Sequence, residues 1–451
     1  MAPSIKALAA IAAIELLLAL LFPLDWTYGL ARGAIVLVLL CGLILLRFWP
    51  RAAVQPAAPR TDAVLAGFLK LAVAAALMLD IGIAVQTVGR CLEKNEIEMD
   101  QGPALWISAR LLWKGENPYG LGALTDLRAY EGRTAQRRAE GIVVSIPAEN
   151  TAEALARYGR TLDPELRKQL LPTATAGKSL LSETRLLGYK YGPLLIDVAA
   201  LFAPLGQPCA IVGLQIAIYA VTLVAMACLF WRAFEDKNLA AIGILALLLD
   251  RHLSWEYVEL AMADIWVLAF CALSVLAFQR SRPLDVGACL GAALGCKLFP
   301  SLIFLPLLLA CGGIRPILVA AGVAAAIYLP WLAWDPAGIF ANIVMWPFVM
   351  FKDTTSWTYY APPQIVLAAR LIALGALALL WYRYLTGRET RLFWTLAVAN
   401  TLLLVTGNTF HNNYIPWALI WVVAAVIERY SAARIPWPLQ GAALLGRPQP
   451  A

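Results

Sequence analysis

The chain has 451 residues, of which 61% are hydrophobic and 14% are charged, and its mean hydropathy is +0.71. Soluble domains carry about a quarter charged residues, so this composition excludes a water-soluble globule, a disordered chain and a disulfide-rich secreted protein. The net charge of +7 does not indicate nucleic acid, because basic residues gather in the cytoplasmic loops of membrane proteins. We therefore expect an all-α polytopic membrane protein.

Apolar runs predict the membrane helices in chain order, since a helix needs about 20 apolar residues to cross a bilayer. A proline inside such a run breaks the helix, and Pro300 predicts a broken pair in the longest run. The sequence thus predicts about 12 transmembrane helices, within a range of roughly 10 to 13. The runs cover approximately residues 7–23, 33–48, 63–88, 208–231, 238–250, 258–279, 284–313, 316–334, 364–383, 392–407 and 413–428.

A shorter apolar run at 191–204 opens with Gly192-Pro193 and closes with Pro204. It is too short for an easy crossing and suits a re-entrant or tilted half-helix buried in protein. If it does not cross, the basic residues of the short loops all fall on one side, which the positive-inside rule places in the cytoplasm. These residues are Arg232, Lys237, Arg280, Arg282, Arg315, Arg383, Arg388, Arg391, Arg429 and Arg434.

This topology divides the chain into four parts in the inner (plasma) membrane. Residues 1–89 form N-terminal transmembrane helices, and 90–190 form a large external, periplasmic loop with interfacial helices. Residues 191–434 form the C-terminal transmembrane region, and 435–451 form a cytoplasmic tail. Polar connections as long as 90–190 are usually functional, so we expect the active side to be external.

Asp100 is the first candidate site residue, because it stands between the third span and a predicted helix at about 104–114. It can be the N-cap of that helix or a general base at the membrane surface, and a rigid helix start suits both roles. The spacing of Glu98 and Asp100 also permits a divalent cation, although we expect no metal and no other cofactor.

Cations on the external side are candidates for binding a phosphate. Arg185, Lys190 and Tyr191 precede the half-helix, where the basic residues can instead extend to lipid headgroups. Lys297 lies inside an apolar run, and a charge in a membrane is a functional-site hypothesis by default.

Two other features of the sequence bear on the role of Lys297. Asp197 or Asp264 could simply neutralise it. The row Gly287, Gly291 and Gly295 precedes it, and such a small-residue row lets a neighbouring helix pack closely.

The chain has two histidines, His252 and His411, and each lies in a predicted external polar turn, at 250–257 and 408–414. Isolated histidines often have no role, but this pair can donate to a phosphate or share a proton with a carboxylate. Asn412 and Tyr414, beside His411, are further candidates. The eight cysteines show no metal spacing, and all but Cys91 lie within or beside apolar runs, so we expect them to be packing residues.

Several of these segments resemble the GT-C-type membrane glycosyltransferases, most closely glycosyltransferase family 87, the polyprenyl-phosphate-mannose-dependent group. Gly192 stands where that family commonly has a proline, and residues 125–181 look like an insertion. The likeness extends over roughly residues 80–429. It is carried by Asp100, Gly115-x-Asn117-Pro118-Tyr119, Tyr191–Leu195, Gly291–Pro300 with Lys297, Thr354–Pro363 and Phe410–Pro416 with His411 and Tyr414.

The resemblance implies an inverting transfer of a mannose-like sugar from a polyprenyl-phosphate donor to a lipid or glycan acceptor at the external face. It implies Asp100 as the base and His411, with Lys297, as ligands of the donor phosphate. His252 and Lys190 are further candidate ligands of the donor phosphate, because the predicted topology places both on the external side. A phosphate leaving group needs cations that hold its developing charge rather than a general acid.

Two other functions fit parts of the pattern. A transporter or flippase of a lipid-linked sugar suits the intramembrane charges, but the polar loop and the lack of a visible sequence repeat count against it. An external transferase of phosphoethanolamine or acyl groups needs a metal-ligand set or a nucleophilic triad, and the sequence shows neither.

Overall fold

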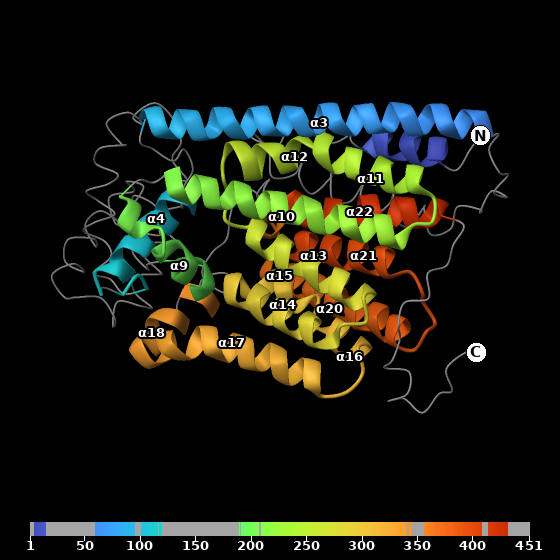
Figure 1. The fold of residues 1–451 in the computed structure, drawn as a ribbon. Coiled ribbons are helices and arrows are strands. Elements are labelled where there is room, and N and C mark those ends of the chain that lie inside the picture. Colours follow the sequence, from blue (N-terminus) through green and yellow to red (C-terminus); the bar gives the residue numbers. More distant parts are fainter. Residues whose placement is uncertain are drawn as a thin grey trace.

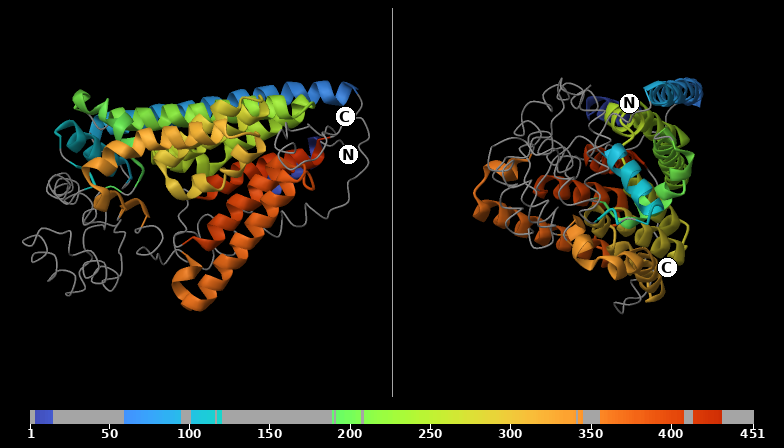
Figure 2. Two further views of the ribbon diagram at one scale, coloured as in Figure 1. Left: turned by 90° about the horizontal axis from the view of Figure 1, so that it is seen from below. Right: turned by 90° about the vertical axis from the view of Figure 1, so that its left-hand side faces the viewer.

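The protein is helical throughout the part that the structure describes. The computed structural model describes residues 4–14, 59–94, 101–115, 117–119, 189, 191–206, 209–340, 342–344, 356–407 and 414–431, and no strand occurs within these ranges. The long helices lie side by side in a bundle with their axes in broadly the same direction (Figures 1 and 2). The expected class, a helical membrane protein, is confirmed at this level.

Most of the predicted apolar runs from residue 63 onward appear as helices with similar bounds. The run at 33–48 and the greater part of 7–23 lie outside the described residues, apart from a helix at Ser4–Ile14. The longer helices are α3 (Pro59–Lys94), α10 (Cys209–Ala233), α11 (Lys237–Leu249), α13 (Ile265–Gln279), α14 (Pro283–Cys296), α17 (Arg315–Trp334), α20 (Pro363–Leu385), α21 (Leu392–Thr406) and α22 (Ile415–Tyr430). The shorter ones are α4 (Gln101–Trp113), α9 (Pro193–Ala200), α12 (Arg251–Ser254), α15 (Leu298–Leu302), α16 (Pro306–Ala310), α18 (Pro336–Ile339) and α19 (Trp357–Tyr360).

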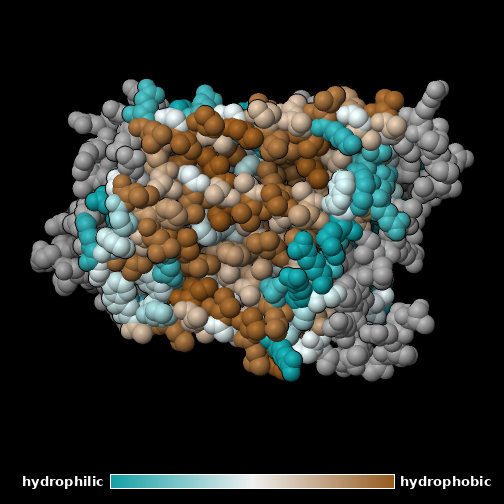
Figure 3. Space-filling model, in the orientation of Figure 1, coloured by the Kyte–Doolittle hydropathy of each residue, from teal (hydrophilic) through white to brown (hydrophobic). Residues whose placement is uncertain are grey.

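Four of the described helices, α3, α10, α17 and α20, are long and apolar enough to cross a membrane. Their apolar side chains are widely exposed, as at Leu71 (74%) and Ile372 (72%), which suits contact with lipid rather than water. Figure 3 shows the resulting apolar belt between two more hydrophilic ends. The total of about 12 spans stays a prediction.

The two ends of the bundle differ in character. One end, which we call the α4 end, carries α4, α9 and α18 (Figure 1). The opposite end, which we call the basic end, carries the turns after α10, α13 and α20 and the start of α17. All the predicted cytoplasmic arginines and lysines that the structure describes belong to the helix ends and turns of the basic end.

The glycine row of α14 packs against α17, as its spacing predicted. A Cβ atom on Gly287 would lie 2.3 Å from the Pro316 carbonyl oxygen, and one on Gly291 would lie 2.7 Å from the Ala320 carbonyl oxygen. The two backbones can therefore approach closely because these positions carry no side chain.

The predicted break in the 284–313 run lies at Lys297, three residues before Pro300. Lys297 has an extended backbone (φ −158°, ψ 118°) that ends α14 and begins α15. Pro300 falls in the first turn of α15, where the missing N–H is tolerated. The break therefore removes Lys297 from the regular helix.

The run at 191–204 forms α9, which has eight residues and is about 12 Å long. This length is too short to cross a bilayer, in agreement with the predicted half-helix. A short 3-10 helix, Ala203–Leu205, follows, and Gly206 ends it with a left-handed backbone (φ 70°). Both α9 and the beginning of α10 lie at the α4 end (Figure 1).

Candidate functional site

Lys297 forms an ion pair with Asp264. Its Nζ lies 2.7 Å from the Asp264 Oδ1 and 3.3 Å from the Tyr414 hydroxyl, to which it also donates. Asp264 immediately precedes α13 and Tyr414 precedes α22, so three helix junctions meet at this ammonium. Of the two acids that could neutralise Lys297, Asp264 does so, whereas Asp197 accepts a hydrogen bond from the Trp331 indole at 3.2 Å.

Aromatic rings surround the same ammonium. The Nζ lies 4.8 Å from the ring centre of Tyr191, 4.6 Å from that of Tyr414 and 5.0 Å from that of Trp417. Tyr414 and Trp417 stack with centroids 4.6 Å apart. We call Lys297, Asp264 and these three aromatic residues the Lys297 site.

The Lys297 site combines a fully buried carboxylate with a lysine side chain that is mostly buried. The Asp264 side chain is 0% exposed, whereas that of Lys297 is 18% exposed. Cation–π contacts stabilise the ammonium most where water is excluded. The carboxylate and the aromatic rings therefore hold the lysine ammonium in a fixed position within the protein.

The Asn117–Tyr119 turn is attached to the Lys297 site through Tyr191. The Tyr119 hydroxyl donates to the Tyr191 carbonyl oxygen at 2.6 Å, and the Tyr189 N–H donates to the Pro118 carbonyl oxygen at 3.0 Å. Burial raises the pKa of Tyr119 and Tyr189 well above the ordinary value, so both phenols stay protonated. Two segments far apart in the sequence, each carrying part of the GT-C resemblance, thus lie together.

The same turn is fixed from its other side by residues that follow α17. Asn117 accepts from the Tyr119 N–H at 2.9 Å, a local bond typical of Asn in turns, and donates to the Asp335 carboxylate at 3.2 Å. The buried Asn342 donates to the Tyr119 carbonyl oxygen at 3.3 Å. Sequence reasoning missed Asp335 and Asn342, although the proline after Asp335 marks the end of a helix.

Gly192, which stands where the resembled family commonly has a proline, packs closely against the end of α14. Its N–H donates to the Cys296 carbonyl oxygen at 2.7 Å, and a Cβ at this position would lie 1.9 Å from the Gly295 carbonyl oxygen. A proline at this position would lose the hydrogen bond and collide with the backbone. The glycine therefore brings Tyr191 close to the Lys297 break.

His252 lies in a short, buried helical segment at the position of the predicted external polar turn. Asp250 caps α12, accepting from the His252 N–H at 2.9 Å, and its Oδ1 lies 3.4 Å from the His252 Nδ1. His252 is 2% and Asp250 is 1% exposed. This geometry suits the sharing of a proton with a carboxylate, one of the two roles considered for the histidines.

A second buried acid lies in α3. Asp80 accepts a hydrogen bond of 2.7 Å from the Tyr219 hydroxyl of α10 and is 5% exposed. Helix α3 packs against the Trp255–Glu259 π-helix, which directly follows the His252 segment. Asp80 stands inside an apolar run, and such an isolated acid is the signal by which the sequence could have identified it.

Six of the predicted site residues lie outside the described residues: Glu98, Asp100, Arg185, Lys190, His411 and Asn412. The roles assigned to them stay predictions. The structure does describe the residue after Asp100, because α4 begins at Gln101, buries Leu105, Trp106 and Ala109, and packs against α9. Among the described residues, no three His, Cys, Asp or Glu side chains are grouped as metal ligands would be.

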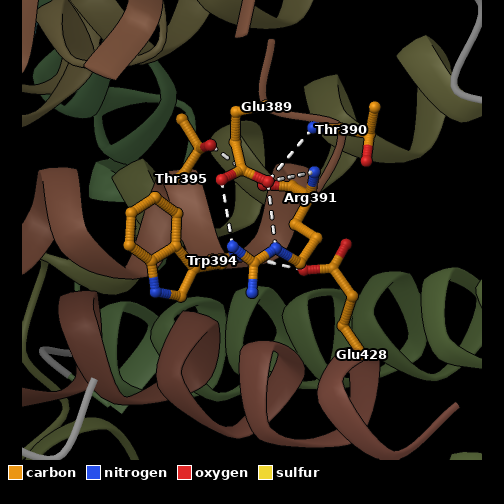
Figure 4. Close-up of polar contacts among 6 residues, drawn as sticks. All are labelled: Glu389, Thr390, Arg391, Trp394, Thr395 and Glu428. Atoms are coloured by element: carbon orange, nitrogen blue, oxygen red, sulfur yellow. Dashed lines mark hydrogen bonds and ion pairs between the residues drawn. The ribbon is translucent and has the colours of Figure 1, made fainter. Parts of the chain in front are cut away.

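A different ion-pair cluster occupies the basic end (Figure 4). Arg391 donates two hydrogen bonds to Glu389, at 2.9 Å and 3.0 Å, and Glu428 accepts from the Trp394 N–H at 3.1 Å. Both carboxylates thus lie at the start of α21, where free N–H groups and the helix dipole favour negative charge. The start of α21 therefore gives this cluster a structural explanation.

Comparison of the chain with protein-family models, curated proteins and solved structures finds no match in any of the three. The GT-C resemblance stays a prediction based on the segments named above.

Proposed function

We propose that the protein is an integral membrane glycosyltransferase of the GT-C type. It transfers a mannose-like sugar from a polyprenyl-phosphate donor to a lipid or glycan acceptor, with inversion and at the external face of the plasma membrane. The observation that carries the proposal is the Lys297 site. A lysine ammonium lies there among aromatic rings, where the Tyr119, Tyr191 and Tyr414 segments of the resemblance meet.

The proposed reaction assigns separate tasks to a base and to cations. The Asp100 carboxylate accepts the proton of the acceptor hydroxyl as its oxygen attacks the anomeric carbon. The bond from that carbon to the donor phosphate breaks, and polyprenyl phosphate leaves with the bonding electrons. Lys297, with His411 and Lys190, stabilises the charge that develops on the phosphate.

The orientation in the membrane follows from the basic end. By the positive-inside rule, its arginines and lysines support a cytoplasmic location for this end and an outward-facing α4 end with the Lys297 site. This arrangement gives a lipid-linked donor access from the outer leaflet.

The test is a transfer assay with purified protein and a polyprenyl-phosphate sugar radiolabelled in the sugar. Wild-type protein should move the label to acceptor lipids or glycans from the same membranes, and Asp100→Asn should reduce this by at least about 100-fold while still binding the donor. The matched control is Asp285→Asn, since Asp285 is exposed in the first turn of α14 at the basic end and should not affect transfer. A flippase would move the intact donor across vesicles and leave the sugar on its lipid, an outcome that contradicts the proposal.

A further inference from the structure

Two tryptophans stack where α17 ends. The ring centroids of Trp331 and Trp334 lie 5.7 Å apart, with an interplanar angle of 25°. Trp331 is 4% exposed, whereas Trp334, the last residue of α17, is 45% exposed. The buried ring therefore holds in place a ring that is open to the surroundings. This end of α17 lies beside α18 at the α4 end of the bundle (Figure 1).

Two half-buried carboxylates accompany the tryptophan stack. Asp197 of α9 accepts a hydrogen bond from the Trp331 indole, which lies 3.2 Å from its Oδ1 and 3.4 Å from its Oδ2. Asp335 follows the last residue of α17. It accepts from the Asn117 side chain at 3.2 Å and from the Gly338 N–H at 2.8 Å. Because an ionised carboxylate can accept about four hydrogen bonds, both acids can accept further donors.

The tryptophan stack is joined to the Lys297 site through Tyr119. The rings of Tyr119 and Trp331 meet edge to face with centroids 5.3 Å apart, and the Tyr119 hydroxyl donates to the Tyr191 carbonyl oxygen at 2.6 Å. The Tyr191 ring in turn lies 4.8 Å from the Lys297 Nζ. A ligand on the open tryptophan would therefore lie beside a donor whose phosphate is bound at the Lys297 site.

We propose that Trp334, Asp197 and Asp335 bind a sugar ring of the acceptor, which is then a glycan or a glycolipid rather than a lipid without sugar. The C–H groups on one face of a sugar ring carry small positive partial charges, which the negative face of an aromatic ring attracts. Sugar hydroxyls donate strong hydrogen bonds to carboxylates. The role as acceptor site rests on the proposed function, whereas the binding of a sugar does not.

A tryptophan at the border of a membrane can also serve only as an anchor in the headgroup region. Such an anchor needs a ring at the level of the headgroups and no carboxylate beside it. Asp197 and Asp335 instead favour a ligand that is rich in hydroxyl donors, because ionised carboxylates only accept hydrogen bonds. The two roles predict different results when sugar binding is measured directly.

Saturation-transfer NMR on the full-length protein tests the sugar binding. The protein is purified in a detergent without sugar groups, and the probes are trisaccharides of mannose, glucose and galactose. Wild-type protein should bind at least one of them, and Trp334→Ala should weaken that affinity by about 10-fold. Trp334→Phe keeps an aromatic face and should lose less. Trp231→Ala is the matched control, since Trp231 is 53% exposed in the last turn of α10 at the basic end and should leave the affinity unchanged.

A carboxylate variant tests the polar part of the site. Asp197→Asn keeps the shape of the side chain and loses its charge, so it should weaken binding of the same trisaccharide by about 5-fold. Failure of wild-type protein to bind any of the three trisaccharides would overturn the proposal. Equal affinities of wild type and Trp334→Ala would also overturn it and leave Trp334 as a membrane anchor.

The transfer assay separates this proposal from the proposed function. Trp334→Ala should raise the KM for the acceptor and leave the KM for the polyprenyl-phosphate donor unchanged. A trisaccharide that binds through Trp334 in a protein without sugar transfer would support the sugar site and contradict the transferase. Transfer with an acceptor KM that does not depend on Trp334 would support the transferase and contradict the acceptor site.

Discussion

The Lys297 ammonium and the Asp264 carboxylate lie 2.7 Å apart, in a pair whose acid is fully buried. Removing one partner of a buried pair leaves an uncompensated charge and costs about 3–5 kcal/mol. We expect Lys297→Met to lower the free energy of unfolding in detergent by about this amount. Thermal unfolding followed by tryptophan fluorescence measures the change.

A double variant separates stability from function. Lys297→Met combined with Asp264→Asn removes both charges, so most of the lost stability should return. Donor binding should stay lost, because no ammonium remains for the phosphate. If the double variant binds the polyprenyl-phosphate sugar as well as wild type does, Lys297 does not contact the donor.

Gly192→Ala tests the close approach of the half-helix to the Lys297 break. The added Cβ would lie 1.9 Å from the Gly295 carbonyl oxygen, so we expect a loss of about 1–3 kcal/mol and a weaker donor affinity as Tyr191 moves. Gly213→Ala in α10 is the control, since a Cβ there meets no atom within 4 Å. That change should raise the stability by up to about 1 kcal/mol. Equal melting temperatures for the two variants would contradict the described geometry.

Tyr119→Phe removes the hydroxyl that donates to the Tyr191 carbonyl oxygen at 2.6 Å. A buried acceptor without its partner costs about 1–3 kcal/mol, and the KM for the donor should rise more than kcat falls. Tyr384→Phe is the control, because that buried hydroxyl has no hydrogen bond in the described part of the chain. Steady-state kinetics at several donor concentrations distinguish the two variants.

Glu428→Leu tests the structural role of the cluster at the basic end. The Trp394 N–H would lose its acceptor, so the free energy of unfolding should fall by about 1–3 kcal/mol. Glu428→Gln keeps an acceptor oxygen and should lose less. Because this cluster is at the opposite end from the Lys297 site, the donor KM of the folded fraction should be unchanged in both variants, and a large rise would show that the two ends are coupled.

Orientation is tested by cysteines placed at the two ends. Tyr360 of α19 is 58% exposed and precedes the start of α20, and Arg388 is exposed in the turn between α20 and α21, at the other end of that helix. A membrane-impermeant maleimide should label Tyr360→Cys in intact cells, and Arg388→Cys only after permeabilisation. The reverse labelling pattern would place the Lys297 site in the cytoplasm.

Hydrophobic periodicity and length were sufficient to predict most of the helices. The runs at 316–334 and 364–383 match α17 and α20 closely, because each is a long apolar stretch bounded by charge or proline. The predicted run at 258–279 begins seven residues before α13 and ends at the same residue. A π-helix at Trp255–Glu259 and a turn with Ala261 at a φ of 50° come before α13, and apolar sequences do not reveal such local geometry.

Tertiary contacts were harder to predict than helices. The sequence offered both Asp197 and Asp264 as partners of Lys297, and only the packing of α13 beside α14 selects Asp264. The contact of Tyr119 with Tyr191 joins segments far apart in the chain, and a single sequence carries no signal for such a pair. The sequence could have predicted that Trp417 lies beside Tyr414, because it follows Tyr414 by about one helical turn.

The most direct measurement is a structure of the full-length protein with bound polyprenyl phosphate, the proposed leaving group. The account predicts that the phosphate lies within hydrogen-bonding distance of the Lys297 Nζ, with Asp264 still on the other side of the ammonium and the lipid chain in the apolar belt. A phosphate bound at the basic end, or one separated from Lys297 by intact protein packing, would contradict it.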